Sequence, residues 1–200
     1  MNITVFFGTF NPIHTAHLII AETVRSELGL EKILFIPAYL PPHRNTSLAL
    51  PEHRLNMVKL AIKDNQYFDI SDIEYRNKGK SYSYLTIKKL YELNPDLTEK
   101  INFIIGTDAF KLIDTWHEAE KLAKLVNFII IKRAESLDID ELFSYIKLKD
   151  FNYKILKTPF IEISSTYIRS NIDKNKSIKY LVPDCVEKYI VENNLYLCNK

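Results

Sequence analysis

The chain alternates short apolar runs, rich in β-branched and aromatic residues, with longer amphipathic stretches. The short runs predict strands over residues 3–7, 32–37, 68–73, 101–105, 128–131 and 153–156. The longer stretches predict helices over residues 17–28, 51–63, 84–93, 119–125, 139–146, 166–171 and 183–193. This rhythm is typical of parallel strands joined by crossover helices. We therefore expect an α/β fold, a Rossmann-like doubly wound parallel sheet with flanking helices.

The length of the chain favours one domain. At 200 residues, 46% of them hydrophobic, it can bury one substantial core. Only four glycines are present, and the sequence contains neither an internal repeat nor a low-complexity linker. We expect a single domain over residues 1–200, with a helical part from about residue 164 to 200 packed on it.

Charge and cysteine content exclude several classes of protein. Lys and Arg number 27 against 25 Asp and Glu, so there is no broad basic field for nucleic acid. The apolar runs fall short of the roughly 20 residues of a membrane span, and the N-terminus lacks a signal-peptide pattern. Cys185 and Cys198 fit neither a disulfide scaffold nor a metal site. These features predict a cytoplasmic protein without nucleic-acid or membrane partners, and they leave both a monomer and a homo-oligomer open.

Ligands of such sheets bind beyond the carboxyl ends of the strands, where the strand order reverses. Polar residues follow four of the predicted strands, at 8–17, 41–44, 106–108 and 164–169. These four segments are therefore the first candidates for functional side chains.

The segment after the first strand is suited to an anion. Gly8 allows close approach of the backbone to a phosphate, Pro12 stiffens the turn, and the next helix offers free N–H groups. His14 and His17 are three residues apart, so both rings can face the same anion. The alternative is a helix-capping turn with two hydrogen-bonded histidines. The combination of two histidines with Gly8 and Pro12 favours the anion site.

A second polar segment lies near the C-terminus. Ser164, Ser165 and Thr166 stand at a predicted helix start, with Arg169 one turn further on. The hydroxyls can cap the helix, and capping is compatible with phosphate binding. A guanidinium above them could hold a phosphate through two hydrogen bonds.

These two segments resemble motifs of the HxGH nucleotidyltransferase superfamily. Residues 8–17, GTFNPIHTAH, are similar to its HxGH loop, and residues 163–169, ISSTYIR, to its ISSTxIR signature. Segments between them resemble bacterial nicotinate-nucleotide adenylyltransferases: PPHR at 41–44, HRLNM at 53–57, SYS at 81–83, GTD at 106–108 and WH at 116–117. The resemblance extends from Ile3 to about Ile172. The chain departs from the family pattern at Phe7 and Ala16, where glycines are usual, at Asn11, where aspartate is usual, and at Leu85, where an acidic residue is usual.

The resemblance implies transfer of AMP from ATP to nicotinate mononucleotide, giving deamido-NAD and pyrophosphate, by direct in-line attack on the α-phosphorus. It implies Mg²⁺ held mainly by the ATP phosphates, and no metal site built from protein side chains. The catalytic residues would be His14, His17 and Arg169. The ATP-binding residues would be Gly8, Thr9, Phe10, His17, Gly106, Asp108, Ile163, Ser164, Ser165, Thr166 and Arg169. The mononucleotide-binding residues would be His43, Arg44, Thr86, Trp116 and His117.

Several of these residues have a structural alternative. Trp116 would stack on the pyridine ring, although a large aromatic side chain is more often part of a core. His43 and Arg44 could clamp the mononucleotide phosphate or belong to a solvated loop. Asp108 could accept a ribose hydroxyl or cap the following helix.

Two further functions stay open at this point. A sibling adenylyltransferase would use nicotinamide mononucleotide or phosphopantetheine as acceptor. A catalytically silent module would retain the fold and bind nucleotide. The presence of His14, His17 and Arg169 together favours an enzyme.

Overall fold

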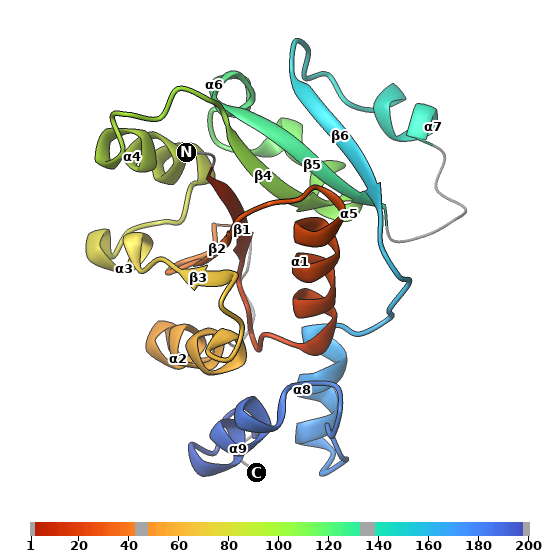
Figure 1. The fold of residues 1–200 in the computed structure, drawn as a ribbon. Coiled ribbons are helices and arrows are strands. Elements are labelled where there is room, and N and C mark those ends of the chain that lie inside the picture. Colours follow the sequence, from red (N-terminus) through yellow and green to blue (C-terminus); the bar gives the residue numbers. More distant parts are fainter. Residues whose placement is uncertain (1–2, 43–47, 133–138, 198–200) are drawn as a thin grey trace.

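Six parallel strands form a single sheet in a computed structural model that describes residues 3–42, 48–132 and 139–197 (Figure 1). The strand order is β3-β2-β1-β4-β5-β6, so the direction of winding reverses between β1 and β4. The strands are β1 (Thr4–Gly8), β2 (Ile33–Pro37), β3 (Phe68–Ile70), β4 (Ile101–Gly106), β5 (Val126–Lys132) and β6 (Asn152–Lys157). The predicted doubly wound parallel sheet is confirmed.

Helices cover both faces of the sheet. They are α1 (Thr15–Glu27), α2 (Pro51–Ile62), α3 (Ile73–Asn77), α4 (Ser83–Leu93), α5 (Thr107–Phe110), α6 (Ala119–Leu125), α7 (Ile139–Ser144), α8 (Ser165–Asp173) and α9 (Asp184–Glu192), with a 3-10 turn, η1, at Ile113–Thr115. Within the described part of the chain, none of these helices is long and apolar enough to cross a membrane.

Alternating residues of the central strands supply two separate cores. On β4, Ile104 joins the core shared with α1, α2, α8 and α9. Its neighbours Phe103 and Ile105 join the core shared with α4, α5, α6 and α7. Because successive side chains of a strand point to opposite faces, central strands buried on both sides read as continuous apolar runs.

The C-terminal helices pack on the first of these cores. Ile168 of α8 and Val186 and Ile190 of α9 are buried together with residues of α1 and α2. Figure 1 shows α8 and α9 next to each other at one end of the molecule, close to α2. The segment that carries Arg169 is therefore fixed on the same face of the sheet as α1.

The structure corrects one predicted strand and adds three short elements. We predicted a strand over residues 68–73, but β3 ends at Ile70 and Ile73 begins α3. The Ser71 hydroxyl oxygen accepts a hydrogen bond from the Ile73 N–H (3.3 Å), which turns the chain into the helix. The sequence patterns did not predict α3, α5 or η1, because such short helices lack enough turns to show a period.

Asparagine side chains form a ladder across the amino ends of three neighbouring strands. Asn102, Asn127 and Asn152 occupy paired positions on β4, β5 and β6. The Nδ2 group of Asn152 donates to Asn127 Oδ1 (3.3 Å), and that of Asn127 to Asn102 Oδ1 (3.4 Å). Asn102 Nδ2 donates in turn to Thr4 Oγ1 on β1 (3.3 Å). The ladder joins four strands at the end of the sheet opposite their carboxyl termini.

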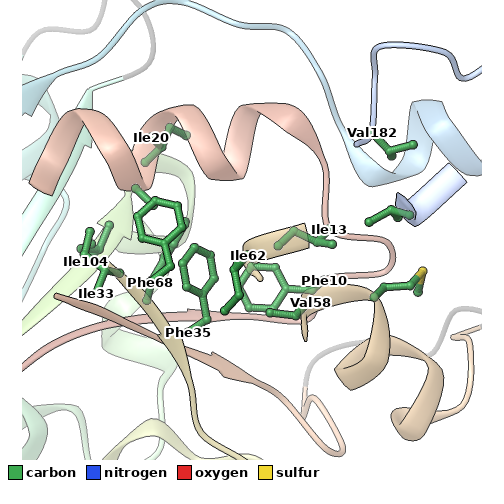
Figure 2. Packing of buried hydrophobic residues seen from close by; sticks show 14 of the residues in the cluster. Phe10, Ile13, Ile20, Ile33, Phe35, Val58, Ile62, Phe68, Ile104 and Val182 are labelled. Atoms are coloured by element: carbon green, nitrogen blue, oxygen red, sulfur yellow. The ribbon is translucent and has the colours of Figure 1, made fainter. Parts of the chain in front are cut away.

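The loop between β1 and α1 is anchored by its apolar side chains. Phe10 and Ile13 are buried in the core together with Phe35 of β2 and Val58 of α2 (Figure 2). Burial of these two side chains fixes the loop at both ends of its turn. It leaves the backbone between them at the carboxyl edge of the sheet.

Candidate functional site

A cleft of about 560 Å³ opens at the carboxyl ends of β1 and β4, where the strand order reverses. This is the position at which open α/β sheets bind their ligands. Residues from several separate segments line it: Phe6, Phe7, Gly8, Thr9, Phe10, His17, Ala38, Pro41, Pro42, Glu74, Ser81, Tyr82, Ser83, Phe103, Ile104, Ile105, Gly106, Asp108, Ala109, Leu112, Trp116, His117 and Ser165. Nine of the predicted site residues are among them.

The loop after β1 makes a tight turn that requires glycine. A Cβ added at Gly8 would lie 2.6–2.9 Å from three atoms of the Phe10 ring. Phe10 itself has a φ of 47°, in the left-handed region that bulky side chains rarely adopt. The peptide bond between Asn11 and Pro12 is cis. This turn exposes Thr9 to the cleft while Phe10 stays buried.

The two histidines of this loop lie against each other. His14 is the N-cap residue of α1 and is buried, whereas His17 is partly exposed and lines the cleft. Their rings stack with centroids 3.6 Å apart. The His14 backbone N–H donates to His17 Nδ1 (3.2 Å), so a neutral His17 ring carries its proton on Nε2. The ring nitrogen of His17 that carries the proton is therefore the one that this contact does not use.

The start of α8 lies directly on the β1–α1 loop. Ser164 caps α8 by accepting the Tyr167 N–H (3.1 Å), as the sequence predicted. The Ser165 hydroxyl donates to the carbonyl of Pro12 (2.9 Å) and lines the cleft. Arg169 Nη1 donates to the carbonyl of Asn11 (2.8 Å). The two motifs, about 150 residues apart in the sequence, are thus brought together.

Other members of the second motif lie around this contact. Arg169 Nη2 donates to the Thr166 hydroxyl oxygen (3.3 Å), which places the guanidinium above the hydroxyl. Ile163 is partly buried and packs against the core, and Ser164 and Thr166 are exposed. Of residues 163–169, Ser165 lines the cleft. The nucleotide contacts predicted for Ile163, Ser164 and Thr166 stay predictions.

Gly106 and Asp108 lie where β4 ends in the cleft. Gly106 occupies the N-cap position of α5, and Asp108 stands in the first turn of that helix. The alternative in which Asp108 caps α5 is therefore wrong. Its exposed carboxylate lines the cleft and can accept a hydroxyl hydrogen bond there.

An aromatic wall borders the cleft on the side of η1. Trp116 lies edge-on to Phe103, with ring centroids 6.1 Å apart. Phe7 stacks on the same Phe103 ring, with centroids 4.8 Å apart. His117 lies 4.4 Å from the ring of Tyr82. Trp116 is only partly buried, so one surface of its indole can receive a flat ring. The sequence did not assign Phe7 or Tyr82 to a site.

Of the other predicted mononucleotide-binding residues, the structure describes only Thr86. Thr86 lines a smaller cavity of about 270 Å³ that shares Glu74, Ser81 and Tyr82 with the main cleft. Its hydroxyl donates to Glu74 Oε1 (2.7 Å), and its backbone N–H donates to the Tyr82 carbonyl (3.2 Å). His43 and Arg44 lie outside the described residues.

A buried arginine connects the loops on the two sides of the cleft. Arg54, on α2, is fully buried and donates hydrogen bonds to four carbonyl oxygens. Its acceptors are Ala49 (3.2 Å), Thr9 (2.9 Å), Tyr39 (2.7 Å) and Ala38. Arg54 therefore holds the loop after β1 against the loop after β2.

Glu74 also holds the loop after β2, through the backbone of Tyr39. Its carboxylate accepts the Tyr39 N–H (3.3 Å) and the Thr86 hydroxyl. Burial raises the pKa of Glu74 above its ordinary value, and hydrogen bonds from Ser81, Thr86 and Tyr39 only partly offset this. The burial of Arg54 and Glu74 was not expected from the sequence, where both residues resemble ordinary polar positions of helices.

The raised pKa of Glu74 predicts a measurable pH dependence. Because the folded state binds a proton here more tightly than the unfolded chain, the free energy of unfolding falls as pH rises from the ordinary value of 4.5 through the folded-state pKa. Glu74→Gln cannot ionise and lacks this dependence. We expect the stability of the variant relative to the wild type to increase as pH rises from about 4 to about 7, in urea unfolding.

Glu92→Gln is the matched control for this measurement. A hydrogen bond from Lys89 lowers the pKa of the exposed Glu92, so its contribution runs in the opposite direction with pH. If the free energies of unfolding of the wild type and of Glu74→Gln differ by the same amount at every pH, the raised pKa of Glu74 is contradicted.

Comparisons with known proteins agree with this geometry. The sequence profile of the cytidylyltransferase-like family matches residues 5–171. A probable nicotinate-nucleotide adenylyltransferase of Caldicellulosiruptor saccharolyticus is 39% identical over 98% of this chain and 99% of its own length. Another, from Desulfitobacterium hafniense, is 40% identical over 97% and 95%. The solved structure of Plasmodium falciparum nicotinic acid mononucleotide adenylyltransferase complexed with NaAD superposes with a TM-score of 0.79 and 25% identity, covering 98% of this chain and 97% of that one. With its two motifs joined at one cleft and relatives matched over nearly their full length, the chain belongs to the nicotinate-nucleotide adenylyltransferase family.

Proposed function

We propose that this protein transfers AMP from ATP to nicotinate mononucleotide. The observation that carries this proposal is the convergence of α8 on the β1–α1 loop, through Ser165 and Arg169, beside His17 in the cleft. That arrangement brings the Arg169 guanidinium and the Ser165 hydroxyl to the loop that precedes His17, at the switch of the sheet. The relatives' names and the NaAD bound by the Plasmodium enzyme support the choice of acceptor.

The reaction needs positioning and charge stabilisation rather than a covalent intermediate. An oxygen of the acceptor 5′-phosphate attacks the α-phosphorus, and the bond from that phosphorus to the bridging oxygen breaks as pyrophosphate leaves. His17 donates from Nε2 to the α-phosphate oxygens as negative charge develops on them, and Arg169 supplies a fixed positive charge. Holding both phosphates in line accounts for much of the acceleration.

Mg²⁺ would act in this cleft with few protein ligands. No group of three or more His, Cys, Asp or Glu side chains that could hold a metal occurs within residues 3–42, 48–132 and 139–197. Nucleotide phosphates and water are the ligands that Mg²⁺ commonly keeps in such sites, where it neutralises charge on the leaving phosphates. Asp108 is the carboxylate of the cleft nearest in sequence to the end of β4.

The acceptor is tested by pyrophosphate release. We expect release with ATP, Mg²⁺ and nicotinate mononucleotide to exceed release with nicotinamide mononucleotide or phosphopantetheine at equal concentrations. Preference for another acceptor would retain the chemistry and contradict the proposed substrate. Absence of release from folded protein with all three would instead support a silent nucleotide-binding module.

Trp116→Ala tests the aromatic wall as the acceptor site. We expect the KM for nicotinate mononucleotide to rise about 10- to 100-fold, because base–aromatic stacking contributes about 1–3 kcal/mol. The KM for ATP should change less than about threefold. Steady-state kinetics with each substrate varied in turn measures both. Equal increases of the two constants would indicate that Trp116 only packs against Phe103.

A further inference from the structure

The side chain of Asn11 connects the β1–α1 loop to a distant part of the chain. Asn11 is 1% exposed, in the middle of the β1–α1 loop. Its Oδ1 accepts the Ala49 N–H (3.1 Å) and the Tyr196 hydroxyl (3.0 Å). Its backbone carbonyl is the acceptor for Arg169 Nη1. One residue therefore receives hydrogen bonds from the segment before α2, from α8 and from the C-terminal segment.

Tyr196 lies in the C-terminal segment after α9, beyond residue 171, where the match to the family profile ends. Its ring packs against the core on which α2 and α9 lie. Burial raises the pKa of Tyr196, so the hydroxyl stays protonated at neutral pH and acts as a donor. Tyr196 is not among the residues that line the cleft.

The position of Asn11 controls the position of the proposed catalytic groups. An amide oxygen has two lone pairs, and Ala49 and Tyr196 occupy both directions. Removing one of these donors releases a bond that helps to fix the side chain. Because the carbonyl of the same residue accepts from Arg169, a shift of Asn11 moves the guanidinium relative to His17. Misplacement of about 1 Å can slow an enzyme about 10²-fold.

We propose that Tyr196 is a positioning residue for the AMP-transfer step, acting through Asn11 on Arg169. The inference rests on the proposed function for its kinetic consequences. It assigns the C-terminal segment a role in the reaction, although its described residues, 193–197, are not among those that line the cleft.

Tyr196→Phe removes one oxygen and keeps the ring in place. We expect the single-turnover rate of AMP transfer to fall about tenfold, equivalent to about 1.4 kcal/mol. The KM values for ATP and nicotinate mononucleotide should change less than about twofold, because charge develops on the phosphates only in the transition state. An unchanged rate, or a rise in KM alone, would overturn the proposal.

Tyr189→Phe is the matched control. The Tyr189 hydroxyl also belongs to the C-terminal part of the chain, but it contacts His53 (2.9 Å) and Asn56 (3.1 Å) on α2 rather than the loop. This variant should keep the wild-type rate. If it slows the reaction as much as Tyr196→Phe does, loss of packing explains both effects and the proposal fails.

A double-mutant cycle separates positioning from general stability. In an Asn11→Ala background the acceptor of the Tyr196 hydroxyl is gone. Adding Tyr196→Phe should then slow the reaction by less than about twofold further. A second tenfold loss in this background would show that Tyr196 does not act through Asn11.

Hydrogen exchange tests the same contact without activity. The amide N–H groups of residues 8–14 should exchange several-fold faster in Tyr196→Phe than in the wild type. In Tyr189→Phe their exchange rates should equal those of the wild type. Equal exchange in all three proteins would overturn the proposal. If the wild type fails to transfer AMP yet this pattern of exchange appears, the proposed function is wrong and the structural inference holds.

Discussion

His17→Ala is expected to slow AMP transfer about 10²- to 10³-fold without unfolding the protein. Removal of one fixed donor to developing negative charge has an effect of this size in other enzymes. The His17 ring is held in place by the His14 N–H, which donates to Nδ1, and by the rings of Phe6 and Phe10 around it. Alanine favours helix at this position of α1, so the helix should persist.

The measurement is the single-turnover rate, with circular dichroism to confirm the fold. The KM for ATP should change little, because the interaction strengthens only as the transition state forms. His53→Ala is the control, since His53 lies on α2 and contacts Tyr189 instead of the cleft. A folded His17→Ala protein that retains the wild-type rate would contradict the role proposed for His17.

Arg54→Met is expected to lower the free energy of unfolding by about 3–5 kcal/mol, because several buried carbonyl oxygens lose their donor together. Methionine fills much of the same volume but leaves four carbonyl acceptors without the guanidinium. It also removes a positive charge that lowers the pKa of the buried Glu74. Each buried group that loses its partner costs about 1–3 kcal/mol. Since domains are typically stable by about 5–15 kcal/mol, this one change removes a large fraction.

Urea unfolding measures the effect, and two variants interpret it. Arg54→Lys keeps the charge but cannot reach carbonyls in several directions, so it should remain clearly destabilised. Arg76→Met removes an exposed arginine that pairs with Asp72 across one helical turn, and should cost less than about 1 kcal/mol. If Arg54→Met lowers the free energy of unfolding by less than about 1 kcal/mol, water takes over the hydrogen bonds of the guanidinium and the prediction is wrong.

The sheet was predictable because its signal is local. Strands buried on both faces are apolar along their length, and the amphipathic stretches between them have the helical period. The rule on strand ends then selected Gly8, His17, Gly106 and Ser165, which the structure places in one cleft. Loop chemistry and topology together were enough for this part of the site.

The buried polar contacts were not predictable for a physical reason. Arg54 sits on a helix whose sequence indicates a solvated charge, and its burial is decided by carbonyls from three separate segments. Tyr196 similarly finds its partner 185 residues away. Helix α5 has four residues, too few to be stable without tertiary contacts. Such features depend on the assembled fold and leave no pattern in a local window.

The asparagine ladder bears on how the cleft keeps its shape. A slip of one residue between strands would turn apolar side chains to the wrong face, but a slip of two residues keeps them on the correct face, so apolar alternation alone does not exclude it. Such a slip would bring the amide of Asn127 beside Ile104 of β4 and part it from Asn102. An amide without its partner there would cost about 1–3 kcal/mol. The last contact of the ladder, from Asn102 to Thr4, ties β4 to β1 in the same way. The ladder therefore fixes, from the far end of the sheet, the relative heights at which β1 and β4 bring Gly8 and Gly106 to the cleft.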